Sequence, residues 1–158
     1  MNDVIIARAL HVLGVVVWIG GVSMVTTVAL PAIRRGDLGE DRLRAFRAFE
    51  HRFVWQARAA VLLVGLTGFY MSWRLELWDR FREFGFWWMH AMVCLWLLFA
   101  FVLFVGEPLI VARYFNGWAR RRPDAAFAWL HRIHGALLVL SLITVFGAVA
   151  GSQGWSVF

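Results

Sequence analysis

The chain contains one cysteine, Cys94, and no lysine. A single cysteine excludes an intramolecular disulfide framework, and Cys94 lies within an apolar run, so it indicates no redox compartment. Common enzyme patterns are also missing from the sequence. It has no Ser–His–Asp order, no glycine-rich phosphate loop and no acidic pair inside the apolar runs. Hydrolytic and phosphate-loop chemistry are therefore not expected.

Apolar residues dominate what is present. They make up 61% of the 158 residues, whereas soluble domains contain roughly 45–50%, and the mean hydropathy is +0.68. Four runs are long enough to cross a bilayer core of about 30 Å: approximately 4–30, 53–73, 86–106 and 133–151. The first run is too long for a signal-peptide core, so we interpret it as a retained span. The sequence predicts an all-α membrane four-helix bundle with short interfacial helices, forming a single membrane domain over residues 1–158.

The charge distribution predicts the orientation of these spans. All sixteen basic residues are arginines and the formal net charge is +6. Two of the connections carry most of them: Arg34, Arg35, Arg42, Arg44, Arg47 and Arg52 in the first, and Arg113, Arg120, Arg121, Arg122 and Arg132 in the third. The positive-inside rule places these loops in the cytoplasm and both termini outside. We expect a multi-pass protein of the bacterial inner membrane, in contact with lipid, with no nucleic-acid partner.

The loops themselves contain helical signals. Leu43, Phe46, Phe49 and Phe53 recur at helical spacing, which predicts an interfacial helix running into the second span. Asp124, directly after Pro123, is a candidate cap for a helix that leads into the fourth span. Near the inner end of the third span, Glu107 precedes Pro108, a pattern typical of an interfacial helix end broken by proline. A proton path to a quinone is the functional alternative for Glu107.

Histidines lie near the ends of all four spans and pair by depth. With a rise of 1.5 Å per residue, His11 lies roughly 10 Å and His90 about 6 Å from the outer side. His51 lies at the inner edge, as does His134 with its neighbour His131. Histidines on facing helices at matching depth are typical axial ligands of haem iron. The predicted metal ligands are His11 with His90, and His51 with His134; simple contact with the membrane interface is the alternative, chiefly for the inner set.

Neighbouring residues are compatible with a cofactor. His11, Gly14, Trp18 and Gly21 form one stripe, where glycines allow either a porphyrin or another helix to approach closely. Arg58 lies about five residues inside the second apolar run. It is interpreted as a cofactor-binding residue that pairs with a haem propionate, with snorkelling to the surface as the alternative.

Three segments carry a resemblance to a known superfamily: "ALHVLGVVVWIGGVSMVTTVALPAIRR", "FEHRFVWQARAAVLLVGLTG" and "FWWMHAMVCLWLLF". They resemble spans of the HemJ-type protoporphyrinogen oxidases and the related CopD-type copper-resistance membrane proteins. The shared features of the first span are an early histidine, a tryptophan seven residues later, small residues after it and a proline with basic residues at its end. The resemblance implies a b-type haem served by His11.

One departure from that superfamily changes the expected activity. The oxidases carry a lysine in the third span, in a pattern like His-Ala-Lys-Leu, whereas this chain has His90, Ala91, Met92 and Val93 there. The resemblance therefore favours a haem-binding relative with a different task and keeps a protoporphyrinogen IX oxidase-like enzyme as the runner-up alternative.

The sequence thus predicts a cytochrome-like membrane protein that binds one or two haem b groups. It would transfer electrons, with a quinone as one candidate redox partner and a membrane oxidoreductase as the broad class. Copper transport or resistance is an alternative, because soft ligands favour Cu(I) and the chain supplies Met24, Met71, Met89, Met92 and Cys94. A structural small subunit of a membrane complex, or a homo-oligomer, is the further alternative.

Overall fold

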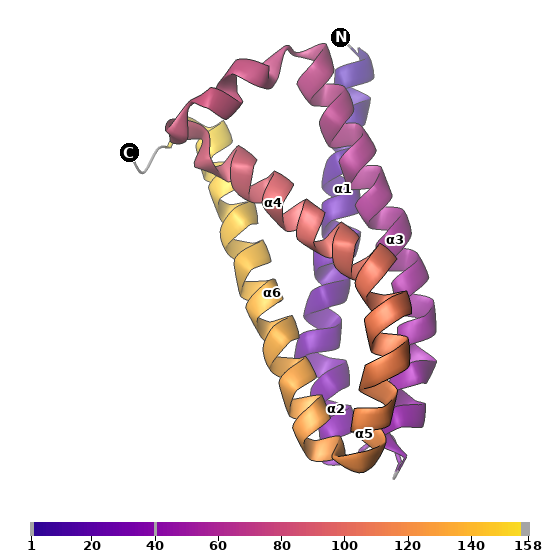
Figure 1. Ribbon diagram of the computed structural model, residues 1–158. Helices are drawn as coiled ribbons and strands as arrows, with labels where there is room; N and C mark the ends of the chain where they lie inside the picture. Colours follow the sequence, from indigo (N-terminus) through magenta and orange to yellow (C-terminus); the bar gives the residue numbers. More distant parts are fainter. Residues whose placement is uncertain (1, 40, 156–158) are drawn as a thin grey trace.

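The computed structural model describes residues 2–39 and 41–155, without the side chains of 110–112. Every element in this part of the chain is helical (Figure 1): α1 Asn2–Met24, η1 Val25–Ala29, α2 Leu30–Arg35, α3 Arg42–Arg74, η2 Leu77–Arg82, η3 Phe84–Phe86, α4 Trp87–Phe101, η4 Val102–Phe115, α5 Asn116–Arg121 and α6 Pro123–Ser152. The predicted all-α class is confirmed.

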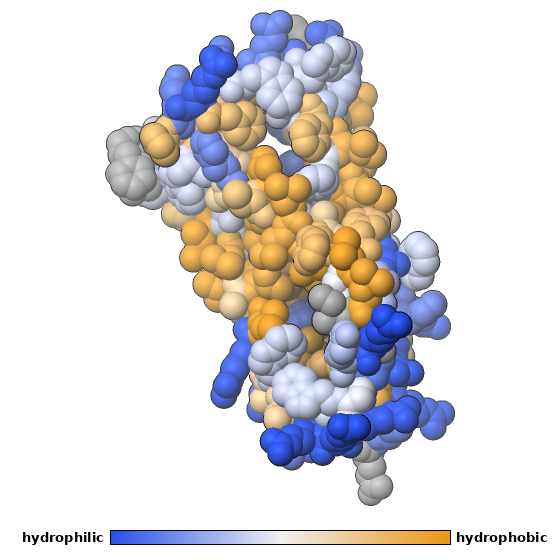
Figure 2. Space-filling model, viewed as in Figure 1, coloured by the Kyte–Doolittle hydropathy of each residue, from blue (hydrophilic) through white to orange (hydrophobic). Residues whose placement is uncertain are grey.

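Four continuous helical segments are long and apolar enough to cross a membrane: Asn2–Arg35, Arg42–Arg74, Phe84–Leu109 and Pro123–Ser152. The protein is therefore a multi-pass membrane protein. Each segment contains most or all of one predicted apolar run and extends beyond it at one end or more. The 33 residues of α3 span about 50 Å at 1.5 Å per residue, more than the roughly 30 Å of hydrocarbon. Figure 2 shows the result as a hydrophobic middle between two hydrophilic ends.

The helices form two closely packed pairs. The helices α1 and α3 pack along much of their length, and α4 packs chiefly on α6. Figure 1 shows α4 crossing the bundle obliquely, from α6 at the end where α1 begins towards α3 further down. The opposite end of the bundle holds α2, α5 and the first turns of α3 and α6. We call it the arginine-rich end.

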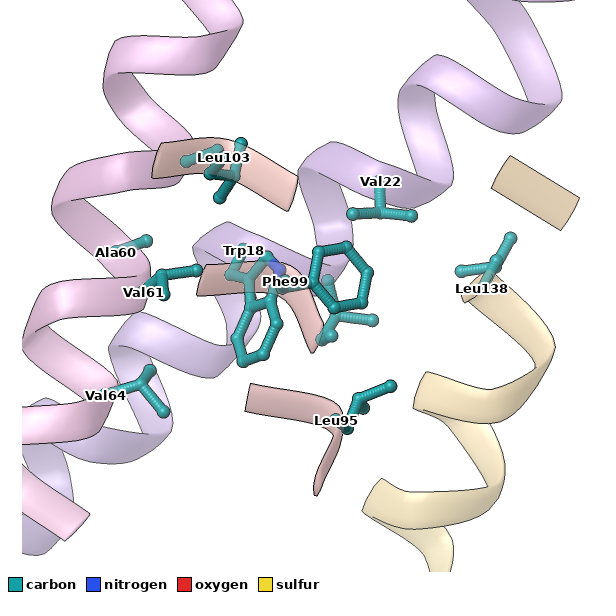
Figure 3. Packing of buried hydrophobic residues seen from close by; sticks show 11 residues of the cluster. Trp18, Val22, Ala60, Val61, Val64, Leu95, Phe99, Leu103 and Leu138 are labelled. Carbon is teal, nitrogen blue, oxygen red and sulfur yellow. The ribbon is translucent and has the colours of Figure 1, made fainter. Parts of the chain in front are cut away.

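Two apolar clusters hold the bundle together. In the membrane-spanning part, Trp18 meets Phe99 edge to face with ring centroids 4.9 Å apart (Figure 3). At the arginine-rich end, Phe46, Phe115 and Phe127 form mutual ring contacts with centroids 5.7–5.8 Å apart. The predicted helix is continuous with the second span as α3, and three of its four predicted apolar residues pack in this cluster: Phe46 is buried, and Leu43 and Phe53 lie against it. Phe49 is exposed at 41% and does not belong to the buried face.

Small residues allow the helices to approach closely. A Cβ added to Gly65 of α3 would lie 2.6 Å from the Trp96 ring of α4, and the Trp96 Nε1 donates to the Val61 carbonyl at 2.9 Å. By contrast, a Cβ on Gly20 would meet nothing within 4 Å. The glycine at position 65 therefore supports the contact between α3 and α4 directly.

Gly65→Ala is expected to destabilise the protein in detergent by about 1–3 kcal/mol, because the Trp96 ring must move away from α3. Gly20→Ala is the matched control and is expected to be neutral or stabilising by up to about 1 kcal/mol, since alanine favours helix. Unfolding midpoints of the two variants measure the difference. Equal stabilities would show that the Trp96 contact does not constrain position 65.

Pro31 and Pro108 each lie in or just after a π-helix, in which the N–H of residue i+5 bonds the carbonyl of residue i. The segment η1 is a π-helix that ends just before Pro31, where the Leu30 N–H bonds the Val25 carbonyl. The segment η4 is a π-helix that contains Pro108. The prediction of a helix end at Pro108 is therefore wrong, because the chain stays helical through α5. Sequence rules for proline assume the α register, in which its ring and missing N–H disrupt the helix.

Asp124 also has a different role from the predicted one. The N-cap of α6 is Arg122, Pro123 is the first helical residue, and no side chain caps this helix. The prediction that Asp124 is the cap is wrong. Asp124 is already within the first turn, and its carboxylate pairs with the Arg42 guanidinium at the start of α3.

Candidate functional site

His11 is the best-oriented histidine of the chain. Its ring lies on α3, where Nδ1 is 3.1 Å from the Val64 carbonyl and 3.0 Å from Thr67 Oγ1. The Thr67 hydroxyl donates to the Leu63 carbonyl at 2.6 Å, so both partners of Nδ1 are acceptors. His11 Nδ1 therefore carries the proton and donates.

The second ring nitrogen of His11, Nε2, has no hydrogen-bond partner among the described residues. Among the described residues, Trp18 Nε1 is the only buried side-chain N or O atom without a hydrogen-bond partner. His11 Nε2 has no partner there either, so it is accessible and not buried. Metal-binding histidines typically donate one ring N–H to a carbonyl and present the other nitrogen to the metal. His11 has this arrangement, and its Nε2 is available as a ligand.

A glycine makes the position of the His11 ring possible. A Cβ on Gly68 of α3 would lie 3.3 Å from His11 Cε1, closer than ordinary contact. The other members of the predicted stripe also face α3, since added Cβ atoms would meet Val64 at Gly14 and Phe53 at Gly21, at 2.8 and 2.5 Å. Helix packing, and not an approaching porphyrin, therefore explains the two stripe glycines.

His90 lies in the first turn of α4 and faces the preceding loop. Its Nε2 is 2.9 Å from the Phe81 carbonyl, and its Nδ1 is 3.3 Å from the Phe86 carbonyl. A neutral imidazole has one N–H, so it can donate to only one of these carbonyls at a time. The shorter contact assigns the proton to Nε2. To bind a metal through Nε2, His90 would have to break its hydrogen bond to the Phe81 carbonyl.

His11 and His90 belong to the same end of the bundle, but the structure does not bring their rings together. The first turn of α4 packs on α6, where Trp87 and Trp88 lie against Gly147 and Gly151. In Figure 1, α4 begins apart from α1 and α3, and Figure 2 shows the molecule hollowed at this level. The two rings therefore have different neighbours, His11 on α3 and His90 at the η2 turn.

The inner histidines are more widely distributed. His51 is exposed on α3, while His134 of α6 donates from Nδ1 to the Leu130 carbonyl at 3.0 Å. His131 Nδ1 accepts from Arg34 at 2.9 Å. The helices α3 and α6 make little contact with each other in the described ranges. His134 Nε2 has no hydrogen-bond partner within residues 2–39 and 41–155, whereas His51 has no hydrogen bond there that orients its ring.

Arg58 makes a set of contacts that the sequence did not reveal. Its Nε and Nη2 donate to the Leu103 carbonyl at 3.1 and 2.9 Å, and Nη2 also donates to Glu107 at 2.8 Å. Its guanidinium lies over the Trp55 ring, 5.2 Å from the centroid. These donors are engaged within the protein, which leaves Nη1 as the nitrogen with which Arg58 could reach an added anion.

The contact with Leu103 has a specific cause. In a π-helix the carbonyl of residue i accepts from the N–H of residue i+5. For Leu103 that residue is Pro108, which has no N–H. Arg58 supplies the missing donors from the neighbouring helix, and Glu107 neutralises its charge inside the membrane segment. One sequence signal could have revealed this contact. Glu107 directly precedes Pro108, on a span that runs antiparallel to the span of Arg58.

Soft copper ligands do not converge on α4. Met89 is buried at 5% exposure, whereas Cys94 is exposed on the surface of the helix. Across the described residues, no group of three or more His, Cys, Asp or Glu side chains is placed to hold a metal ion. The histidines remain the strongest candidate ligands, and His11 leads them on geometry.

Comparisons of the chain with protein-family models, curated proteins and solved structures find no match. The resemblance to the HemJ-type and CopD-type proteins thus stays a prediction. The functional argument rests on the residues of the chain itself, and above all on the anchored imidazole of His11.

Proposed function

We propose that this protein is a b-type membrane cytochrome in which His11 is an axial ligand of the haem iron. The observation that carries the proposal is the hydrogen bonding of the His11 ring, with Nδ1 anchored on α3 and Nε2 unpartnered. The Val64 carbonyl and Thr67 hydroxyl fix the tautomer and raise the basicity of the ligand. Haem, when bound, supplies a one-electron carrier, and the apolar spans exclude water from it.

His90 is the proposed second ligand, because it lies at the same end of the bundle. Its Nε2 is held by a single carbonyl of the η2 turn at 2.9 Å, and one net hydrogen bond contributes only about 0.5–1.5 kcal/mol. A metal–nitrogen bond outweighs that contact. Since η2 is a short 3₁₀ turn between the second and third spans, a movement of Phe81 away from His90 would leave the four spans intact.

We expect one haem per chain, because His51 is exposed and, in the described part of the chain, has no hydrogen bond that would orient its ring as the ring of His11 is oriented. The expected ratio of haem to protein is therefore about one, and His51→Ala should leave it unchanged. A pyridine haemochrome assay against protein concentration measures it. A ratio near two that falls in the His51→Ala and His134→Ala variants would instead establish the inner site.

The proposed location is the bacterial inner membrane, with both termini outside. The arginine-rich end lies opposite the end where α1 begins and α6 ends (Figure 1), and this asymmetry favours retention of that end in the cytoplasm. Reporter fusions after the last residue and within the Arg35–Arg44 loop should report opposite sides, with the C-terminus outside. A cytoplasmic C-terminus would reverse the orientation and place the His11 end towards the cytoplasm.

The optical spectrum of the purified protein tests the proposed function. We expect a reduced-minus-oxidised difference spectrum with the α-band of b-type haem, and partial reduction on addition of a quinol. A colourless protein that contains copper would support the copper-handling alternative and overturn the proposal. The absence of both haem and copper would favour a structural subunit.

A further inference from the structure

The arginine-rich end contains a pocket that the proposed electron transfer does not use. It has a volume of about 680 Å³ and lies between the first turns of α3 and α6 and the end of α5. The lining residues are Asp41, Arg42, Leu43, Arg44, Arg47, Ala119, Arg120, Pro123 and Asp124. It is an open, charged hollow at the surface, so a ligand there would be held by charge and hydrogen bonds and would stay in contact with water.

The two carboxylates of this pocket are already engaged. Asp41 accepts the backbone N–H of Arg44 at 3.0 Å as the N-cap of α3, and Asp124 pairs with Arg42. Neither Arg44 nor Arg120 bonds a carboxylate in the described part of the chain. The lining therefore holds four arginines and two carboxylates, an excess of two positive charges, and Arg44, Arg47 and Arg120 form no ion pair in the described part of the chain.

Helix ends add to the positive potential. The pocket lies at the N-termini of two long helices, α3 with 33 residues and α6 with 30. The side chain of Asp41 caps α3, but no side chain caps α6, so backbone N–H groups of its first turn lack a capping acceptor. Free N–H groups and the helix dipole both favour an anion there.

A second, smaller depression adjoins this pocket. It has a volume of about 280 Å³ and is lined by Pro31, Arg34, Arg35 and Asp124, so it shares Asp124 with the first. Its two arginines already have partners, because Arg34 donates to His131 and Arg35 pairs with Asp37, so an extended ligand would have to share them. Arginine forks match the geometry of phosphate oxygens and bind them in pairs of hydrogen bonds.

We propose that this arginine-lined pocket binds a phosphate-bearing ligand, with Arg44 and Arg120 as its principal contacts. Two sources share this chemistry: the headgroup of an anionic phospholipid and a soluble phosphate compound. Arg47 lies six residues before the apolar run of α3, about 9 Å along the helix, just beyond a headgroup layer of roughly 5–7 Å. The pocket consequently borders on both the headgroups and the water phase.

The test compares two variants of equal charge. Arg44→Gln/Arg120→Gln removes the two arginines that are the proposed principal contacts of the ligand. Arg121→Gln/Arg132→Gln is the matched control, since both of its arginines are exposed near the same end and outside the pocket lining. Unfolding midpoints without ligand verify that both variants fold. The probes are pyrophosphate in detergent solution, and nanodiscs of phosphatidylglycerol with phosphatidylcholine.

For a soluble ligand, pyrophosphate should raise the unfolding midpoint of the unmodified protein, and the pocket variant should bind it at least about tenfold more weakly. For a lipid ligand, native mass spectrometry should show phosphatidylglycerol retained by the unmodified protein and lost from the pocket variant. The control should behave as the unmodified protein in both arms. Equal weakening in the two variants, or no binding of either probe, would overturn the site.

Discussion

His11→Ala is expected to remove the haem from the purified protein, while the polypeptide still inserts into the membrane. Insertion depends on the apolar length of the spans, whereas iron ligation in the proposed site depends on the unpartnered Nε2 of His11. The expected result is loss of the b-type absorption bands at unchanged protein yield. His90→Ala should have the same effect if it supplies the second ligand.

Two controls separate ligation from folding. Thr67→Val keeps the shape of the side chain but removes one acceptor of the His11 Nδ1–H, so haem affinity should fall about 10–100-fold without complete loss. His51→Ala should retain the haem fully. Full haem content in both His11→Ala and His90→Ala would contradict the assignment of the ligands.

Arg58→Leu is expected to destabilise the protein by up to about 3–5 kcal/mol, the typical cost of removing one partner of an ion pair held away from water. The Arg58 and Glu107 side chains are 19% and 27% exposed and lie within two membrane segments. Glu107 would be left without its countercharge, and the Leu103 carbonyl would lose both of its side-chain donors. Unfolding in detergent measures the loss. Arg58→Leu/Glu107→Leu should recover most of it, because no unpaired charge remains.

The role of Pro108 gives this prediction a sharper form. In a Pro108→Ala variant, residue 108 gains a backbone N–H that can donate to the Leu103 carbonyl if the π-helix is kept. This N–H would take over part of the role of Arg58 as hydrogen-bond donor. The cost of Arg58→Leu should then be smaller by about 1–3 kcal/mol, the penalty of an unsatisfied buried carbonyl. The same cost in both backgrounds would show that Arg58 does not compensate for the proline.

The sequence predicted the spans well because bilayer thickness sets a minimum apolar length, and each run exceeds it. It also predicted that α3 begins before the membrane, since Phe46 lies on the apolar face of a helical pattern. It did not predict the course of the chain through Pro108. The Leu103 carbonyl, one π-helical turn before this proline, takes its donors from Arg58, 50 residues before Pro108 in the chain, and local proline rules contain no information on such a partner.

The candidate site was only partly predictable for a related reason. Helical rise fixes the depth of His11 and His90, so their common end of the bundle followed from residue numbers alone. The direction in which each ring points depends on which helix packs beside it. The sequence did not reveal that α1 presents His11 to α3, or that the start of α4 packs on α6 with His90 against Phe81. Those contacts decide which ring nitrogens are available.

Ligation of haem iron by His11 is tested most directly by the low-temperature EPR spectrum of the oxidised protein. A low-spin ferric haem signal, as given by two nitrogen ligands, is predicted for the unmodified protein, and it should disappear in His11→Ala. A spectrum without any ferric haem signal, or a low-spin signal that persists unchanged in His11→Ala, would contradict the proposed cytochrome.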